Sequence, residues 1–207
     1  MSAQRKQRNT HPPTLTVFAG PNGSGKTTLT NRLLTENRLG ILVNADQIAE
    51  RLAQVGGKLT ATTEMQIQAA KAAEEMRWEL LNQGASFTTE TVMSDHSRWI
   101  RFFEAAHERG YLMSLIFVTT SDPAINIGRV SQRVRMGGHS VDTEKIISRY
   151  HKAHQFLPRA LELFDQAWFF DNSAINEPVL VLSMTKENGL VAHVPSEQLP
   201  QWAKALI

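Results

Sequence analysis

The sequence predicts an α/β fold of three layers, in which a parallel sheet lies between two layers of helices. Three observations predict it. Short apolar segments alternate with segments of helical periodicity along most of the 207 residues. The segment 111–118 is apolar almost throughout, as expected for a central parallel strand that is buried on both faces. Near the end of the chain, Asn188-Gly189 separates two apolar runs, which is typical of an antiparallel hairpin.

Five parallel strands are expected, each a short run rich in apolar or β-branched residues. They lie at 14–19, 41–44, 86–89, 111–118 and 167–170. The runs 178–184 and 190–194 flank Asn188-Gly189 and are expected to extend one edge of the sheet as an antiparallel hairpin.

Helices are expected where apolar residues recur every three or four positions. They lie at 25–36, 45–54, 63–82, 97–108, 122–135, 143–164 and 199–207. The sequence Thr63-Glu64-Met65-Gln66 has the form of a capping box, and Gly84 is a typical helix stop. Pro158 predicts a kink or an end within the helix 143–164, because proline lacks the N–H that helical hydrogen bonding needs.

Composition indicates one globular domain, which we place at residues 13–207, preceded by a flexible basic arm at residues 1–12. No apolar run reaches the ~20 residues that a bilayer-spanning helix needs, so we expect no contact with a membrane. The chain has no cysteine, which excludes disulfides and Cys-based zinc sites, and we expect a cytoplasmic location. A net charge of +2 does not favour nucleic acid as the partner.

The segment from Gly20 to Thr28 carries the most specific motif of the chain. Gly20-Pro21-Asn22-Gly23-Ser24-Gly25-Lys26-Thr27 has the full spacing G-x-x-x-x-G-K-[ST], between a predicted strand and a predicted helix. The backbone N–H groups of such a loop, together with the start of the following helix, bind phosphates. We therefore expect ATP binding by Gly20, Asn22, Gly23, Ser24, Gly25, Lys26, Thr27 and Thr28, and we expect the Thr27 hydroxyl to hold Mg²⁺. These features specify a P-loop NTPase or kinase fold.

The rest of the chain narrows the class of P-loop protein. It lacks the Asn-Lys-x-Asp that reads guanine in GTPases and the Ser-Gly-Gly-Gln signature of ABC ATPases. After residue 171 there is no room for the further helical domain of AAA-type machines. A small-molecule kinase needs only an acceptor base at a nearby strand end and a lid that carries arginines over the phosphates.

Two carboxylates are candidates for the acceptor side of the site. Asp46 follows the second strand, and Glu90 ends the third, so both are expected at the carboxyl edge of the sheet, where ligands bind in open α/β folds. Asp46 has two functional interpretations, as the base that accepts a hydroxyl proton or as a Mg²⁺ ligand through water. The structural alternative is that Asp46 caps the helix that follows it.

The lid candidate lies at about residues 122–141 and carries Arg129, Arg133 and Arg135. Arg129 and Arg133 are four residues apart and share a helix face. Arginine forks match phosphate oxygens, and an arginine on the transferring phosphate is worth roughly 10³–10⁵ in rate. The alternative interpretation is a solvated basic helix face.

Beyond the P-loop, four segments of the chain resemble the zeta-toxin family of P-loop kinases, in its compact chromosomal branch. They are Asn44-Ala45-Asp46-Gln47-Ile48-Ala49, the segment from Phe87 to Ser94, the segment from Arg129 to Val141, and Asp171-Asn172-Ser173. With the P-loop, they follow the family order from residue 18 to about residue 173. The region after residue 94 resembles the longer, plasmid-type members poorly.

The resemblance implies an ATP- and Mg²⁺-dependent kinase that phosphorylates the 3′-hydroxyl of UDP-N-acetylglucosamine. On this sequence it implies that Lys26 holds the phosphates and that Asp46 is the base. It further implies that Glu90 and Thr91 contact the acceptor, and that Arg133 or Arg135 reaches the γ-phosphate. Asn172 is then expected near the adenine, and a separate antitoxin protein is a possible partner.

Two other functions stay open from the sequence. One is a P-loop kinase for another small-molecule or nucleic-acid acceptor. The other is a nucleotide-dependent binding module without acceptor chemistry, in which Asp46 and Glu90 are structural.

Overall fold

The computed structural model describes residues 11–35, 40–138, 140–174 and 177–207. Its strands form one sheet in the order β2-β3-β1-β4-β5-β6-β7. They are β1 (Thr14–Ala19), β2 (Ile41–Val43), β3 (Phe87–Thr91), β4 (Leu112–Thr119), β5 (Gln166–Asp171), β6 (Val179–Thr185) and β7 (Gly189–Ala192). The helices are α1 (Lys26–Thr35), α2 (Ala45–Val55), α3 (Thr63–Gln83), α4 (His96–Glu108), α5 (Pro123–Arg135), α6 (Thr143–Leu161) and α7 (Gln201–Lys204), with a 3-10 turn η1 (Ser196–Gln198).

The sheet has the predicted mixed character. β2, β3, β1, β4 and β5 pair in parallel, and β6 and β7 add two antiparallel strands beside β5. The turn between β6 and β7 closes with Gly189 at φ 64°, and the N–H of Asn188 donates to the Thr185 hydroxyl at 3.1 Å. The predicted five-stranded parallel sheet with a C-terminal hairpin at one edge is therefore confirmed.

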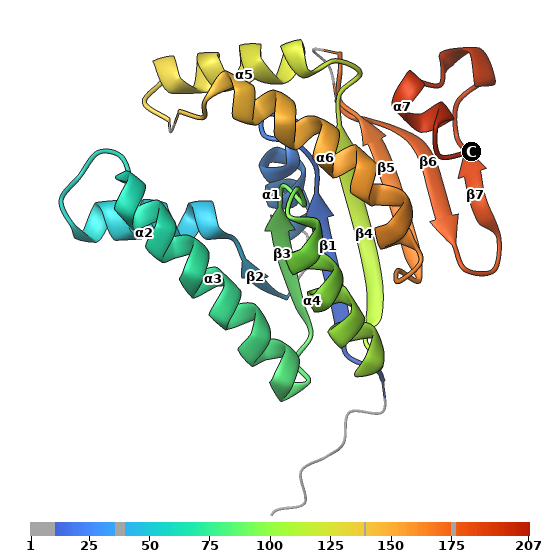
Figure 1. Cartoon of the computed structure of the whole chain (residues 1–207), viewed down its shortest axis with the longest axis horizontal. Helices are drawn as coiled ribbons and strands as arrows, with labels where there is room; N and C mark the ends of the chain where they lie inside the picture. The colour runs from blue at the N-terminus through green and yellow to red at the C-terminus, as the bar shows by residue number, and fades with distance from the viewer. Residues whose placement is uncertain (1–10, 36–39, 139, 175–176) are drawn as a thin grey trace, which may run out of the picture.

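The sheet has a core on each face because neighbouring residues of a strand point to opposite sides. In β1, Leu15 and Val17 join the larger core, which contains residues of α3, α4 and α6. Phe18 faces the other way and packs with Leu29 and Leu33 of α1. Figure 1 shows α4 and α6 on the near side of the sheet and α1 behind it. This arrangement gives the three predicted layers.

Three local predictions were wrong. The cap of α3 is Thr62 rather than Thr63, because Thr62 keeps an extended backbone and its hydroxyl accepts the N–H of Met65 at 3.3 Å. Of the two outcomes predicted for Pro158, an end of the helix is wrong, because α6 continues to Leu161, while a kink stays a prediction. The missing N–H of Pro158 costs one hydrogen bond in the last turn of α6, where the neighbouring Leu157 is buried in the core. The C-terminal helix is only α7, because Pro200 sets its start.

Some predictions lie partly outside the described residues. Of the predicted arm at residues 1–12, only His11 and Pro12 are described, and the predicted end of the first helix at Glu36 and lid position His139 also fall outside. Among the helices that the structure does describe, none is long and apolar enough to cross a membrane.

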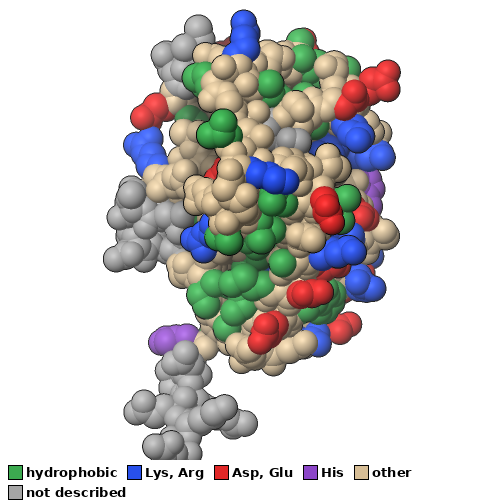
Figure 2. Space-filling view, turned by 90° about the vertical axis from the view of Figure 1, so that its left-hand side faces the viewer, with side chains coloured by type: hydrophobic (Ala, Val, Ile, Leu, Met, Phe, Trp, Pro, Cys, Tyr) green, Lys and Arg blue, Asp and Glu red, His purple; other side chains and the backbone are tan. Residues whose placement is uncertain are grey.

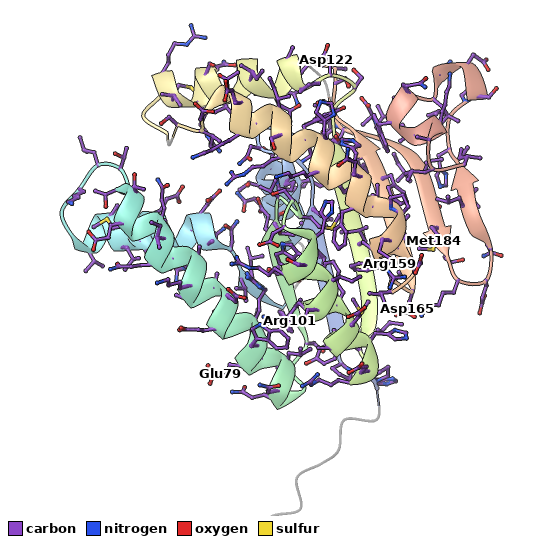
Figure 3. All side chains as sticks on the ribbon, viewed as in Figure 1. Glu79, Arg101, Asp122, Arg159, Asp165 and Met184 are labelled. Carbon is purple, nitrogen blue, oxygen red and sulfur yellow. The ribbon has the colours of Figure 1, made fainter. Side chains whose placement is uncertain are left out.

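Asp165 joins the end of α6 to the hairpin and supports a stability prediction. Its carboxylate accepts from Lys186 Nζ at 2.6 Å and from the Met113 N–H at 2.7 Å. Burial alone raises the pKa of Asp165, but these two hydrogen bonds and the Lys186 charge outweigh it and hold the pKa below 3.8. Figure 3 labels Asp165 near the lower end of the sheet, close to Met184 of β6.

Asp165→Asn is expected to lower the free energy of unfolding by about 1–2 kcal/mol at neutral pH, because the charged acceptor is lost from a partly exposed pair. In the native protein, this stabilisation is present above pH 3.8 and is lost as the pH falls through the lower folded pKa of Asp165. Urea denaturation from pH 7 to pH 3 measures both effects. The control is Glu187→Gln, an exposed carboxylate in the same turn. An equal loss in both variants would contradict the assignment.

Candidate active site

The P-loop follows β1 and takes a conformation that requires glycine. Gly20 has φ 142°, and a Cβ there would lie 2.0 Å from the carbonyl oxygen of Val118 in β4. Gly25 has φ 95°, and a Cβ there would lie 2.3 Å from Nδ2 of Asn172. Both glycines therefore allow close approach as well as unusual backbone angles. The loop leads directly into the N-terminus of α1, which is the geometry of a phosphate site.

Side chains from distant segments hold this loop in place. Asn172, at the end of β5, donates from Nδ2 to the carbonyl oxygen of Ser24 at 2.8 Å. Asn126 in α5 donates to the carbonyl oxygen of Asn22 at 2.6 Å, and Arg149 in α6 donates to the Asn22 side chain at 3.2 Å. The contact of Asn172 in this structure is thus with the P-loop backbone. The prediction that Asn172 lies near an adenine stays a prediction.

Lys26 is buried, and its ammonium donates to the carbonyl oxygen of Pro21 at 2.9 Å. Burial lowers the pKa of Lys26, and the carboxylates of Glu90 and Asp46 partly oppose this effect. Both acidic residues are therefore close enough to act on the Lys26 charge. The strand order explains this proximity, since β3 lies beside β1 and β2 lies beside β3.

A chain of hydrogen bonds joins the P-loop to the ends of β3 and β2. The Thr27 hydroxyl donates to Glu90 Oε1 at 2.7 Å, and Asn44 Nδ2 donates to Glu90 Oε2 at 3.1 Å. Asn44 is buried, and its Oδ1 accepts the N–H groups of Asp46 and Gln47 at 2.8 and 3.4 Å. Asn44 is therefore the cap of α2 and also orients Glu90.

This contact bears on the structural alternative for Asp46. Because Asn44 caps α2, the structural alternative in which Asp46 is the cap is wrong. Asp46 instead lies in the first turn of α2, with its side chain exposed and lining the cavity above the P-loop. An exposed carboxylate at this place is available to a substrate.

The three predicted arginines of α5 do not all face the cavity. Arg129 and Arg133 line the cavity, whereas Arg135 is exposed and is not among its described lining residues. Two residues turn a helix by roughly 200°, so Arg135 points away from the face that Arg133 shares with Arg129. Arg129 Nη2 donates to the carbonyl oxygen of Ala174 at 3.1 Å, and its buried Nη1 has no hydrogen-bond partner among the described residues. Arg149 of α6 also lines the cavity and was not predicted.

One cavity of about 590 Å³ brings most of these groups together. The predicted site residues that line it are Asn22, Gly23, Gly25, Lys26, Thr27, Thr28, Asp46, Glu90, Thr91, Arg129 and Arg133. Gly20, Ser24 and Asn172 lie in or behind the P-loop and are not among its described lining residues. The cavity continues beyond the P-loop to a wall made by α3, α4 and the segment 91–95.

The fold and the site define a P-loop kinase-like protein, with a phosphate-binding loop at the carboxyl edge of a parallel sheet. Residues 15–157 match the AAA domain family (AAA_33), and the chain belongs to this family. The matched residues run from β1 into α6. After Asp171, the described residues 177–207 add two strands, a 3-10 turn and a short helix, and hold no further helical domain.

A protein from Haemophilus influenzae, described as uncharacterized, is 28% identical over 133 residues, which cover 64% of this chain and 89% of that protein. The crystal structure of AvrRxo1-ORF1:-ORF2 with ATP is similar at a TM-score of 0.71 and 17% identity, over 89% of this chain and 61% of the matched chain. The PezAT chromosomal toxin-antitoxin system of Streptococcus pneumoniae is similar at a TM-score of 0.62 and 15% identity, over 98% of this chain and 86% of the matched chain. At these identities, the two structures bear on the fold alone.

Proposed function

We propose that this protein is an ATP-dependent kinase that transfers the γ-phosphate of ATP to the 3′-hydroxyl of UDP-N-acetylglucosamine. The observation that carries the proposal is the position of Asp46. Its exposed carboxylate lines the same cavity as Lys26 and Thr27, while Asn44 takes over the capping of α2. A base and a phosphate-binding loop on one cavity are the two halves of a phosphotransfer site.

In the proposed reaction, the P-loop N–H groups and Lys26 bind the β- and γ-phosphates of ATP. The acceptor hydroxyl oxygen attacks the γ-phosphorus, and the bond from that phosphorus to the β–γ bridging oxygen breaks. ADP leaves with the electron pair of that bond, and the hydroxyl proton passes to the Asp46 carboxylate. Arg129 and Arg133 line the cavity from α5, where guanidinium groups can contact phosphate oxygens.

The residues present also fit Mg²⁺. Magnesium prefers oxygen ligands and usually keeps one or two protein ligands beside waters and substrate phosphates. The Thr27 hydroxyl and the Glu90 carboxylate lie 2.7 Å apart and supply such oxygens, and Asp46 can reach the ion through water. When bound, the ion stabilises the negative charge that develops on the transferring phosphate. Glu90, which the resemblance assigns to the acceptor, would then hold the ion together with Thr27.

The solved structures with this fold support the proposal in two respects. One was determined with ATP and with a second protein, ORF2, and another belongs to a toxin-antitoxin system. We therefore include in the proposal ATP as the phosphate donor and a separate antitoxin as partner. Figure 2 shows the face that carries α2 and α3, on which the Lys and Arg side chains drawn lie among Asp and Glu side chains. This mixture favours a small-molecule acceptor over a nucleic acid on that face.

Mass spectrometry after incubation with ATP, Mg²⁺ and UDP-N-acetylglucosamine tests the proposal. We expect UDP-N-acetylglucosamine to gain one phosphate and ADP to form in equal amount. The acceptor panel also contains UDP-glucose, UDP, NAD and a 5′-hydroxyl oligonucleotide. Phosphorylation of another compound would keep the kinase and replace the acceptor. ATP binding without any phosphorylated product would instead favour a binding module.

A further inference from the structure

Arg77 is a buried cation that the proposed reaction does not use. It lies on α3, on the wall of the cavity opposite the P-loop elements, and its relative exposure is only 7%. A buried guanidinium is costly unless an anion or several hydrogen bonds compensate it. The groups that surround the Arg77 guanidinium therefore indicate its role.

The neighbours of Arg77 support its position but do not neutralise it. Its guanidinium carbon lies 4.9 Å from the ring centroid of Trp99 in α4. Glu74 is the nearest source of negative charge, but its carboxylate lies 3.7 Å from Arg98. Within the described part of the chain, Arg77 makes no hydrogen bond and no ion pair within 4.0 Å.

Arg77 keeps its positive charge at the wall of the cavity. Burial lowers the pKa of Arg77 to about 10, with Glu74 opposing this and Arg98 adding to it, so the group stays charged at neutral pH. Arg98 lines the same cavity, where its guanidinium lies 3.7 Å from Glu74 and 3.6 Å from Asp95. Arg77 has no such ion pair among the described residues, and its place on the cavity wall favours an anionic ligand there.

The segment 91–95, which forms part of the same wall, stores backbone strain. Met93 is fully buried and lines the cavity with φ 57°, a conformation that is unusual for a residue other than glycine. The Thr91 hydroxyl holds it by accepting the Met93 N–H at 2.8 Å. Backbone strain of this kind is concentrated at ligand-binding sites. The segment 91–95 and Arg77 thus face the same part of the cavity.

We propose that Arg77, stacked on Trp99, binds a phosphate group of the acceptor and thereby selects acceptors that carry a diphosphate. This inference rests on the proposed function, because it places the acceptor in the part of the cavity beyond the P-loop. A planar guanidinium matches phosphate oxygens in a bidentate manner, and the Trp99 ring fixes its plane. Arg98, on the same wall, is paired with Glu74 and Asp95, so the inference rests on Arg77.

Calorimetric titration of pyrophosphate into protein saturated with Mg²⁺ and a non-hydrolysable ATP analogue tests the inference, because the P-loop is then occupied. Arg77→Met is expected to weaken pyrophosphate binding about 10–100-fold, and Arg77→Lys by less. The matched control is Arg101→Met. Arg101 also lies over a tryptophan, 5.6 Å from Trp78, but on a separate groove with Glu79, and Figure 3 labels both near the lower end of α3 and α4.

Comparing UDP with uridine separates phosphate recognition from base recognition. We expect Arg77→Met to weaken UDP binding and to leave any uridine binding unchanged. Equal pyrophosphate affinity in Arg77→Met and the native protein would overturn the inference. Absence of pyrophosphate binding to the native protein would overturn it as well.

Thermal unfolding without ligand distinguishes binding from a structural role. Removing a buried charge that has no bonded partner should leave the melting temperature unchanged or raise it. A large decrease in the melting temperature of Arg77→Met, or failure to fold, would show a structural role and overturn the inference.

The proposed kinase reaction and the proposed anion site can fail separately. Arg77-dependent pyrophosphate binding without UDP-N-acetylglucosamine phosphorylation would reject only the acceptor. If Arg77→Met phosphorylates UDP-N-acetylglucosamine with an unchanged KM for that acceptor, only the anion site is rejected.

Discussion

Asp46→Asn is expected to lower kcat by about 10²–10⁴-fold, because the amide cannot accept the acceptor's hydroxyl proton. ATP binding should change little, since the P-loop and Lys26 are untouched. The substitution is isosteric, and Asn44 rather than Asp46 caps α2, so no helix cap is lost. Steady-state kinetics with labelled ATP measure kcat, and calorimetry with a non-hydrolysable analogue measures ATP affinity.

The matched control is Glu50→Gln. Glu50 is an exposed carboxylate one helical turn further along α2, and it lines the neighbouring groove together with Asp46. We expect native kcat in this variant. A native kcat in Asp46→Asn would show that another group accepts the proton, and an equal loss in both variants would point to a general effect of charge on α2.

The donor half of the site could be predicted from the sequence because its signals are local. The P-loop needs a strand, eight residues with fixed spacing and a helix, and all of these lie between Thr14 and Thr35. Asp46 and Glu90 could be predicted for a related reason. Each follows or ends a strand, and parallel strands present their carboxyl ends at one edge of the sheet. The sequence did not show that Asn44 links Asp46 to Glu90. In the sequence, Asn44 is only a polar residue that precedes a predicted helix.

The rest of the site depends on packing between distant segments. Arg149 reaches Asn22 across 127 positions, and Arg77 meets Trp99 only because α3 packs beside α4. On the sequence, each is one charged residue within an amphipathic helix. For the lid arginines, the sequence could predict the shared helix face but not what that face contacts. Periodicity places Arg129 and Arg133 on one face, but only the structure shows that this face lines the cavity and that Arg135 does not.

Lys26→Met is expected to lower kcat by about 10²–10³-fold or more and to weaken ATP binding. Lys26 is the buried cation of the P-loop, and no other lysine lies among the described residues that line the cavity. In the native protein, ATP with Mg²⁺ should raise the melting temperature, because a ligand that binds only the folded state stabilises it. This shift should be absent in Lys26→Met and unchanged in the control Lys71→Met, an exposed lysine on α3.

The burial of Lys26 also predicts how the stability of Lys26→Met, relative to the native protein, depends on pH. Burial lowers the folded pKa of Lys26 below 10.5, so the unfolded chain binds more protons between the two values and the native protein gains stability as the pH rises through that window. Methionine carries no charge to bury, so without ATP Lys26→Met should be as stable as the native protein or more stable at pH 7. That advantage should shrink toward pH 10.5 in thermal unfolding. A variant that is less stable than the native protein at pH 7 would mean that the bond from Lys26 to the Pro21 carbonyl holds the P-loop in shape, in addition to any role on phosphate.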